Sequence, residues 1–129
     1  MLDNAQIVRD LYAAFGRGDV PFIINHLAPD VVWVQEGPGE IPWSGTHFGP
    51  AEASYFFDGL GKTTTDARLD MTVFVAQDDK VATFGRFAAT VNGRRVSTPV
   101  AHLFVFRDGM VVQYRNFSNT AAFQHVYTG

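Results

Sequence analysis

The second half of the chain is built from long stretches in which every other residue is apolar. In the first of these stretches the alternating apolar residues are Leu69, Met71, Val73 and Val75. A period of two predicts a β-strand, and this one ends at Asp78-Asp79. Three more strands follow, joined by turns at Asn92-Gly93 and Asp108-Gly109, which are strong hairpin signals. The strands run to about ten residues each, against a usual length of about five or six. Because long antiparallel strands twist and curl, the pattern predicts a strongly curved antiparallel sheet.

Before these strands the sequence predicts three helices. Asp3 or Asn4 caps the first helix. Asp19 caps a short second helix, and we expect Pro29 to stop it. Gly49-Pro50 opens the third. The apolar faces of the first and third helices are formed by Ile7, Leu11, Phe15, Phe56, Phe57 and Leu60. Helices followed by strands indicate an α+β domain, in which three N-terminal helices cover a cone-shaped curved sheet and an apolar cavity lies between them.

The composition bounds the size of the core and indicates a surplus of aromatic rings. The chain has 129 residues, so we expect a single domain, 1–129, that buries roughly two thirds of its unfolded surface. Aromatic residues make up 14% of the chain and include twelve phenylalanines, which is more ring than a small core needs. Such a surplus suits a lined cavity or an apolar subunit interface. We therefore expect a small apolar ligand and a homodimer formed through the outer face of the sheet.

Charge and residue usage argue against several other functions. The formal net charge is −3 and the ten basic residues are spread along the chain, which argues against nucleic acid as a main ligand. There are no cysteines and no helix-spaced histidine pair, so we expect neither a metal nor an organic cofactor. No apolar run reaches membrane-spanning length and the N-terminus lacks a signal-peptide pattern, so we expect a cytoplasmic protein without membrane contact.

The segment 30–50, DVVWVQEGPGEIPWSGTHFGP, carries the most distinctive candidate for chemistry. A strand-like run that includes Trp33 leads to Glu36 in a Gly/Pro-rich turn, and the chain returns through Trp43. A carboxylate between two indoles is a candidate acid/base group, because apolar surroundings shift the pKa of a carboxylate. The alternative is that Glu36 and Glu40 are ordinary solvated loop acids. His47 lies nearby and is either an acid/base partner for Glu36 or a plain loop histidine.

Four motifs, in this order and spacing, resemble the nuclear transport factor 2-like superfamily. They are LYAAFGRGD, LAPDVVWV, the PWSGT-x-x-G turn and the ending HLFVFRDGMVVQYRNFSNTAAF. Within the superfamily the chain is most similar to ketosteroid isomerase-related and SnoaL-like, polyketide cyclase-type proteins. The resemblance covers nearly the whole chain and implies a cystatin-like roll with an apolar pocket and a few polar groups at its base.

The resemblance implies that the chain keeps one catalytic group of the isomerases and lacks two others. Aligned through the PWSGT turn, the general-base aspartate falls on Glu36. The two oxyanion-hole donors fall on Leu11 and Ala101, which cannot donate, and Tyr12 points about 100° away from Leu11 on a helix. Each missing donor would forfeit ~3 kcal/mol of transition-state stabilisation, so a true steroid isomerase is not expected.

The chain also lacks the acidic residues that the cyclases carry. Aspartates expected near the end of the last strand are Asn116 and Asn119 here, and amides cannot take up a proton at neutral pH. The aspartate–arginine–aspartate set of limonene epoxide hydrolase-like proteins is reduced to Arg86, because its carboxylate positions hold Ala88 and Asn116.

The same alignment implies which residues face the cavity. On the strand AHLF it turns Ala101 and Leu103 inward and His102 outward, toward a dimer interface, although a slip of one residue would reverse this. The other side chains that we expect to line the pocket are Phe15, Trp33, Trp43, His47, Phe56, Tyr114, Asn116 and Ser118. His26 and His125 are weaker candidates for a functional role.

Two functional hypotheses remain. The first is an enzyme in which Glu36 acts as general base on a small carbonyl compound and Asn116 or Tyr114 donates a hydrogen bond. The alternative is a non-catalytic ligand-binding or dimeric assembly module that kept the pocket and lost the chemistry. The missing donors and acids favour the module, whereas the carboxylate at the base position favours the enzyme.

Overall fold

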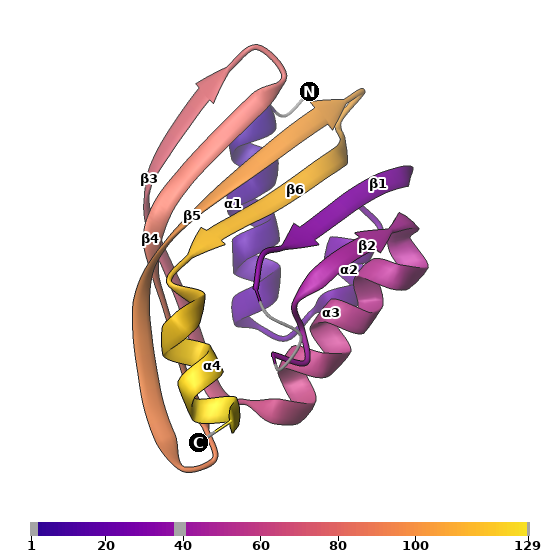
Figure 1. Ribbon diagram of the computed structural model, residues 1–129. Coiled ribbons are helices and arrows are strands. Elements are labelled where there is room, and N and C mark those ends of the chain that lie inside the picture. The colour runs from indigo at the N-terminus through magenta and orange to yellow at the C-terminus, as the bar shows by residue number, and fades with distance from the viewer. Residues whose placement is uncertain (1–2, 38–40, 129) are drawn as a thin grey trace.

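The computed structural model describes residues 3–37 and 41–128 of the chain (Figure 1). Over these residues three helices precede the run of four long strands, as the sequence predicts, and a fourth helix follows that run. The elements are α1 (Asn4–Gly16), α2 (Val20–Ile24), β1 (Leu27–Gln35), β2 (Gly45–Phe48), α3 (Gly49–Thr63), β3 (Thr65–Gln77), β4 (Lys80–Val91), β5 (Arg94–Arg107), β6 (Met110–Ser118) and α4 (Thr120–Thr128).

The strands form one curved sheet in the order β2-β1-β6-β5-β4-β3. The four strands from β3 to β6 pair antiparallel with their sequence neighbours, which confirms the predicted run of hairpins. Two features were not predicted: the short strand β2, and the parallel pairing of β1 with β6. The sheet is therefore mixed at one edge, because β1 reaches β6 through a long connection rather than through a hairpin.

The two predicted hairpin turns have the backbone conformation that their residues favour. Asn92 and Gly93 have φ of 51° and 78°, and Asp108 and Gly109 have φ of 53° and 77°. Positive φ at both central residues matches the right-handed twist of the flanking strands, and Asn, Asp and Gly adopt it at the least cost.

The strand β3 passes very close to the backbone of Gly85 in β4. The register between the two strands shifts between Met71 and Val73, which marks a β-bulge. A Cβ atom at Gly85 would lie 2.1 Å from the backbone oxygen of Asp70. Only glycine permits this close approach of two backbones.

The helices gather inside the curve of the sheet (Figure 1). Asp3 caps α1 by accepting a hydrogen bond from the backbone N–H of Gln6, which confirms the expected cap. Pro29 does not stop α2 as expected, because that helix already ends at Ile24 and Pro29 lies within β1. A fourth helix, α4, joins the three N-terminal ones and buries Phe123 in the core.

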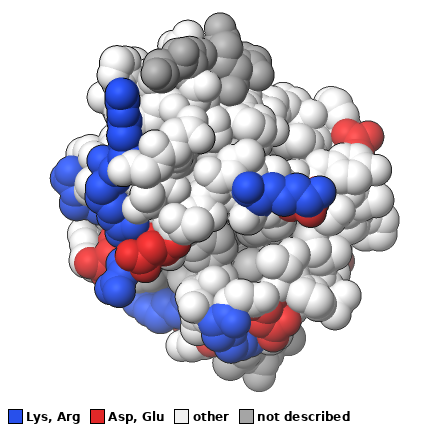
Figure 2. All heavy atoms as spheres, turned by 90° about the horizontal axis from the view of Figure 1, so that it is seen from below, with Lys and Arg blue, Asp and Glu red and all other residues white. Residues whose placement is uncertain are grey.

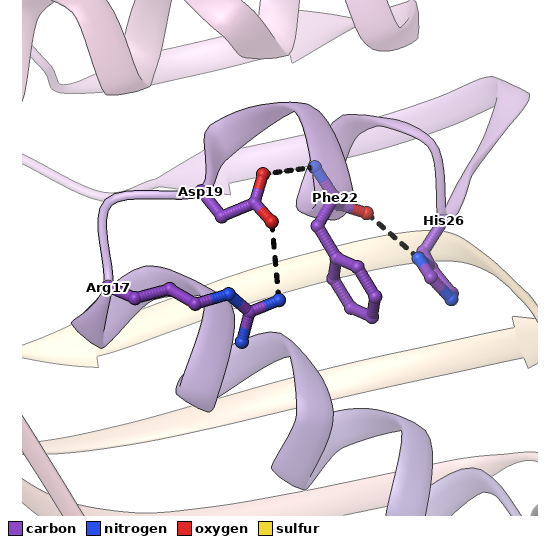
Figure 3. Close-up of polar contacts among 4 residues, drawn as sticks. All are labelled: Arg17, Asp19, Phe22 and His26. Carbon is purple, nitrogen blue, oxygen red and sulfur yellow. Dashed lines mark hydrogen bonds and ion pairs between the residues drawn. The ribbon is translucent and has the colours of Figure 1, made fainter.

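Polar contacts stabilise both ends of the short helix α2, and one of them involves the candidate histidine His26 (Figure 3). Asp19 accepts a hydrogen bond from the backbone N–H of Phe22 at 3.2 Å and pairs with Arg17 at 3.2 Å. Nδ1 of His26 donates to the backbone oxygen of Phe22 at 2.8 Å. His26 therefore has a structural contact at the end of α2.

Charged side chains lie at the surface, largely in pairs. Arg107, at the end of β5, forms a forked ion pair with Asp30 of β1, at 2.7 and 3.1 Å. Viewed from below, basic side chains gather along one edge beside a wide uncharged area (Figure 2). Within residues 3–37 and 41–128, none of the helices is both long and apolar enough to cross a membrane.

Candidate functional site

A cavity opens between the inner face of the sheet and the helices. It offers about 60 Å³ to the centres of water molecules, within about 650 Å³ of atom-free space that includes its opening to solvent. The small volume that is open to the centres of water molecules indicates a narrow space. Its wall is largely aromatic and aliphatic, and the lining residues are Leu11, Tyr12, Phe15, Ile23, Trp33, Gln35, Trp43, Phe56, Phe57, Leu60, Leu69, Phe87, Val100, His102, Phe104, Tyr114, Asn116, Ser118 and Phe123.

Aromatic rings from distant parts of the chain meet in this wall. Trp33 of β1 pairs with Tyr114 of β6 in the parallel register, and their rings stack with centroids 3.9 Å apart and planes at 19°. Trp43 meets the rings of Phe56 and Phe123 edge-on, at 6.2 and 5.3 Å. The wall therefore combines one flat stacked surface with edge-on rings, arrangements that aromatic groups favour.

A connected set of polar side chains crosses this apolar wall. The hydroxyl of Tyr12 lies 2.6 Å from the Thr83 hydroxyl and 2.7 Å from Nδ1 of His102. On the other side of the ring, Nδ2 of Asn116 lies 3.2 Å from Nε2 of His102 and 3.4 Å from the Tyr114 hydroxyl. We name Thr83, Tyr12, His102, Asn116 and Tyr114 the polar chain.

The hydrogen bonds of the polar chain specify the tautomer of its histidine. The Asn116 amide nitrogen can only donate, so Nε2 of His102 accepts and the ring proton lies on Nδ1. Nδ1 then donates to the Tyr12 hydroxyl, which in turn donates to the hydroxyl oxygen of Thr83.

Burial keeps the titratable members of the polar chain uncharged. His102 is only 3% exposed, and burial lowers its pKa from 6.5 to about 3. Burial also raises the pKa of the Tyr12 hydroxyl and that of the Tyr114 hydroxyl above their ordinary value. Near neutral pH the cavity therefore presents a neutral imidazole and two neutral phenols, which act as hydrogen-bonding groups rather than as charges.

The expectation that Glu36 is buried between the two indoles is wrong. Glu36 is exposed, lies outside the cavity wall and forms an ion pair with Arg115 at 2.6 Å. The strand β1 extends one residue beyond the predicted run, and the period of two that turns Trp33 inward also turns Gln35 inward. The side chain that enters the cavity from this strand is therefore an amide. Glu40 lies outside the described residues.

The inward face of β5 is also displaced by one residue from the expectation. Ala101 and Leu103 are absent from the cavity wall, whereas Val100, His102 and Phe104 line it. The predicted outward position of His102 is therefore wrong, and the alternative register is the correct one.

Tyr12 lines the cavity and contacts His102, although its helical position next to Leu11 was expected to turn it away from the pocket. Leu11 and Tyr12 both line the cavity. His47 lies outside the wall, half-buried on β2 opposite Trp33.

The remaining expected pocket residues lie in the cavity wall. They are Phe15, Trp33, Trp43, Phe56, Tyr114, Asn116 and Ser118. Among the polar side chains of the wall, sequence reasoning missed Tyr12, Gln35 and His102. The strand alternation already present in the sequence could have identified Gln35, because it lies two residues after Trp33.

Among the residues that the structure describes, no group of three or more His, Cys, Asp or Glu side chains could hold a metal ion. The polar groups that line the cavity include an imidazole, hydroxyls and amides. Their arrangement suits hydrogen bonding to an organic ligand.

Comparisons with known proteins agree with this architecture. The model of a SnoaL-like domain family matches residues 8–114. A nuclear transport factor 2-like protein of unknown function from Burkholderia pseudomallei is 29% identical, with a TM-score of 0.93 and 100% of both chains covered. A similar protein from Burkholderia thailandensis is 26% identical, with a TM-score of 0.89 over 98% of each chain.

A third solved structure is that of TerC co-crystallised with polyporic acid. TerC is 26% identical to this chain, with a TM-score of 0.88 over 98% of each chain. A protein from Xanthomonas campestris at 24% identity is described as having a cystatin-like fold, which agrees with the predicted fold class. The comparison with curated proteins found no match.

Proposed function

Because the chain belongs to the SnoaL-like domain family, we propose that it binds a small, flat, largely apolar compound that carries a carbonyl or hydroxyl oxygen. The observation that carries the proposal is the buried, neutral His102 held in an aromatic cavity wall between Tyr12 and Asn116. A buried polar group in such a wall orients a ligand, while the rings around it supply apolar contact.

The shape of the cavity supports a flat ligand. The space is narrow, and the stacked pair Trp33 and Tyr114 forms a planar side to it. An aromatic or conjugated ring system can lie against such a surface and gain stacking as well as burial. The similar TerC was co-crystallised with polyporic acid, which supports a ligand-binding role for this chain.

Binding of 2-naphthol tests this proposal. We expect a calorimetric titration to give a Kd below ~1 mM, which is reasonable for a ligand of this size. Ser118→Phe, which adds a ring to the cavity wall, should weaken binding by at least about tenfold. The matched control is Ser97→Phe on the exposed side of β5, which should bind as the wild type does. Absence of binding, or equal weakening in both variants, would overturn the proposal.

A second candidate function is acid–base chemistry on the bound carbonyl compound. It is favoured by the polar chain, in which the 2.7 Å hydrogen bond between Tyr12 and His102 joins two groups with exchangeable protons. A neutral imidazole donates a hydrogen bond to a developing oxyanion in other enzymes, and here the oxyanion would take the place of the Tyr12 hydroxyl as the partner of the Nδ1–H group.

Deuterium exchange at the carbon next to the carbonyl of 1-tetralone, followed by NMR in D₂O, tests this candidate. The wild type and Glu36→Gln should accelerate exchange, whereas His102→Gln and Tyr12→Phe should lose at least about tenfold of that acceleration. If the wild type does not accelerate exchange, the protein is a binder without this chemistry. Loss of acceleration in Glu36→Gln alone would return the role of base to the carboxylate.

We also propose that two copies of the chain pair through the outer face of the sheet. Across β3, β4, β5 and β6 the register aligns Val73, Phe84, Ala101 and Phe117 in one row. Val73, Phe84 and Phe117 are 47%, 46% and 50% exposed in the single chain. A contiguous apolar row of this kind on a sheet face favours a self-complementary interface.

Sedimentation velocity at about 10 μM tests the dimer, since a modest interface is largely occupied at that concentration. The wild type should sediment as a dimer and Phe84→Glu as a monomer. Tyr55→Glu is the matched control, because Tyr55 is 65% exposed but lies on α3, away from this face. A monomeric wild type would refute the pairing, as would a dimeric Phe84→Glu.

A further inference from the structure

We infer that one side of the cavity is a hydrogen-bonding subsite for an uncharged hydroxyl group, so that the ligand is a neutral hydroxyarene or enol. This inference rests on the proposed function and specifies its ligand. The subsite consists of Trp33, Gln35 and Asn116, and we call it the polar subsite.

The polar subsite contains three buried polar atoms without a hydrogen-bond partner. They are Nε1 of Trp33, Oε1 of Gln35 and Oδ1 of Asn116. Gln35 is 1% exposed and Trp33 is 4% exposed, so neither side chain obtains its hydrogen bond from bulk solvent. Buried polar groups in folded proteins are rarely left unpaired because their lost hydration is costly. Three such atoms in one cavity wall therefore indicate a ligand that supplies the missing partners.

The fold brings these three side chains onto adjacent strands. In the parallel pairing of β1 and β6, Gln35 lies opposite Asn116, and Trp33 lies opposite Tyr114. All of them line the same cavity. One small group on a ligand can therefore approach the two amides together, with the indole N–H two residues away on the same face of β1.

The chemistry of the polar subsite requires a ligand that both donates and accepts. Nε2 of Gln35 donates to the backbone oxygen of Glu36 at 3.3 Å, which fixes the amide orientation because a carbonyl oxygen cannot make that contact. Oε1 of Gln35 and Oδ1 of Asn116 are thus left as acceptors, and Nε1 of Trp33 is left as a donor. A hydroxyl group donates its one hydrogen to one of the two amide oxygens, or shares it between them, and its oxygen accepts from the indole N–H, so it pairs with both kinds of atom in the set.

The surroundings select an uncharged ligand. None of the lining residues given above is Lys, Arg, Asp or Glu. A carboxylate or phosphate entering the cavity would lose its hydration and meet two amide oxygens without a positive partner. A phenol or an enol in its neutral form avoids this cost.

Three naphthalenes of matched shape test the inference by calorimetric titration of the wild-type protein. We expect 2-naphthol to bind about tenfold more tightly than 2-methylnaphthalene, because only the hydroxyl pairs with the subsite. We expect 2-naphthoate to bind at least about tenfold more weakly than 2-naphthol. If 2-naphthol binds, but no more tightly than 2-methylnaphthalene, the polar subsite is refuted while the proposed function stands. If neither compound binds, both proposals fail.

Gln35→Leu locates the preference within the cavity. Leucine is similar in size to glutamine but has no acceptor. The ratio of the affinity for 2-naphthol to that for 2-methylnaphthalene should therefore fall toward one in this variant. Gln113→Leu is the matched control, since Gln113 lies on β6 outside the cavity wall and should keep the wild-type ratio. An unchanged ratio in Gln35→Leu would show that the hydroxyl binds elsewhere, such as at His102, and would overturn the inference. The wild-type comparison of the three compounds decides the matter even where this variant does not fold.

Discussion

The buried histidine of the polar chain makes the stability of the protein depend on pH in a calculable way. His102 has a pKa of about 3 in the folded protein, against 6.5 for a free side chain, because burial disfavours its charged form. As the pH falls below 6.5, the unfolded chain takes up a proton at this residue and the folded chain does not. The free energy of unfolding therefore falls as the pH falls, and above 6.5 this contribution is constant.

The size of the effect follows from the two pKa values. Between pH 7 and pH 5 the shift of His102 from 6.5 to about 3 removes about 2 kcal/mol of stability. A small domain has only about 5–15 kcal/mol of net stability, so this loss is readily measured. The window lies above the range in which Asp30 and Asp79 titrate, because arginine and lysine partners lower the pKa of these carboxyls. Partial burial also lowers the pKa of His47, which adds to the loss with the same sign.

Urea unfolding at pH 5, 6 and 7, at fixed protein concentration, measures the effect in three proteins. The wild type should lose about 2 kcal/mol from pH 7 to pH 5. His102→Gln should lose much less over the same range, whatever its absolute stability, because the variant carries no titrating group there. His47→Gln should keep most of the wild-type slope. Equal slopes in the wild type and His102→Gln would refute the assignment of the pH dependence to this ring.

Two further predictions concern packing and use the same unfolding assay. Gly85→Ala should destabilise the protein by at least about 2 kcal/mol, since its Cβ would lie 2.1 Å from the backbone oxygen of Asp70. Gly61→Ala is the matched control in α3, where no atom lies within 4 Å of the new Cβ, and it should stabilise the protein by about 1 kcal/mol. Unchanged stability of Gly85→Ala would contradict the close approach of the two backbones. Tyr127→Phe should cost about 1–3 kcal/mol because Nε1 of Trp43 loses the hydroxyl that it reaches at 2.7 Å, and an unchanged stability would show that the indole finds another partner.

The parts of the fold that were predictable are those specified by local sequence. The hairpins follow from Asn92-Gly93 and Asp108-Gly109, and the start of α1 follows from the cap at Asp3, because each signal acts within a few residues. The parallel pairing of β1 with β6 has no such signal, since it joins segments far apart in the chain. It was therefore absent from the prediction.

The candidate site was less predictable because both faces of β5 are apolar. Alternation establishes that His102 and Ala101 point in opposite directions, but it does not say which set faces the core. The inward set includes Val100 and Phe104, which are buried, whereas the outward set of smaller or half-buried residues belongs to the proposed dimer face. An apolar outer face removes the contrast in polarity that normally specifies the orientation of a strand.

The same displacement by one residue changes the chemistry that the site can perform. Where β1 and β6 pair, Val34 lies opposite Arg115 and Gln35 lies opposite Asn116, so charge and amide alternate between the two faces of the sheet. Glu36 and Arg115 neutralise each other outside, at 2.6 Å. A carboxylate at the position of Gln35 would face apolar rings without a cation, and its burial would be costly unless it took up a proton. The amide avoids this cost and keeps two hydrogen-bonding atoms in the cavity. Under the inference above, such a site would distinguish ligands by the presence and position of a hydroxyl group, because none of its lining residues carries a charge with which to attract a charged ligand.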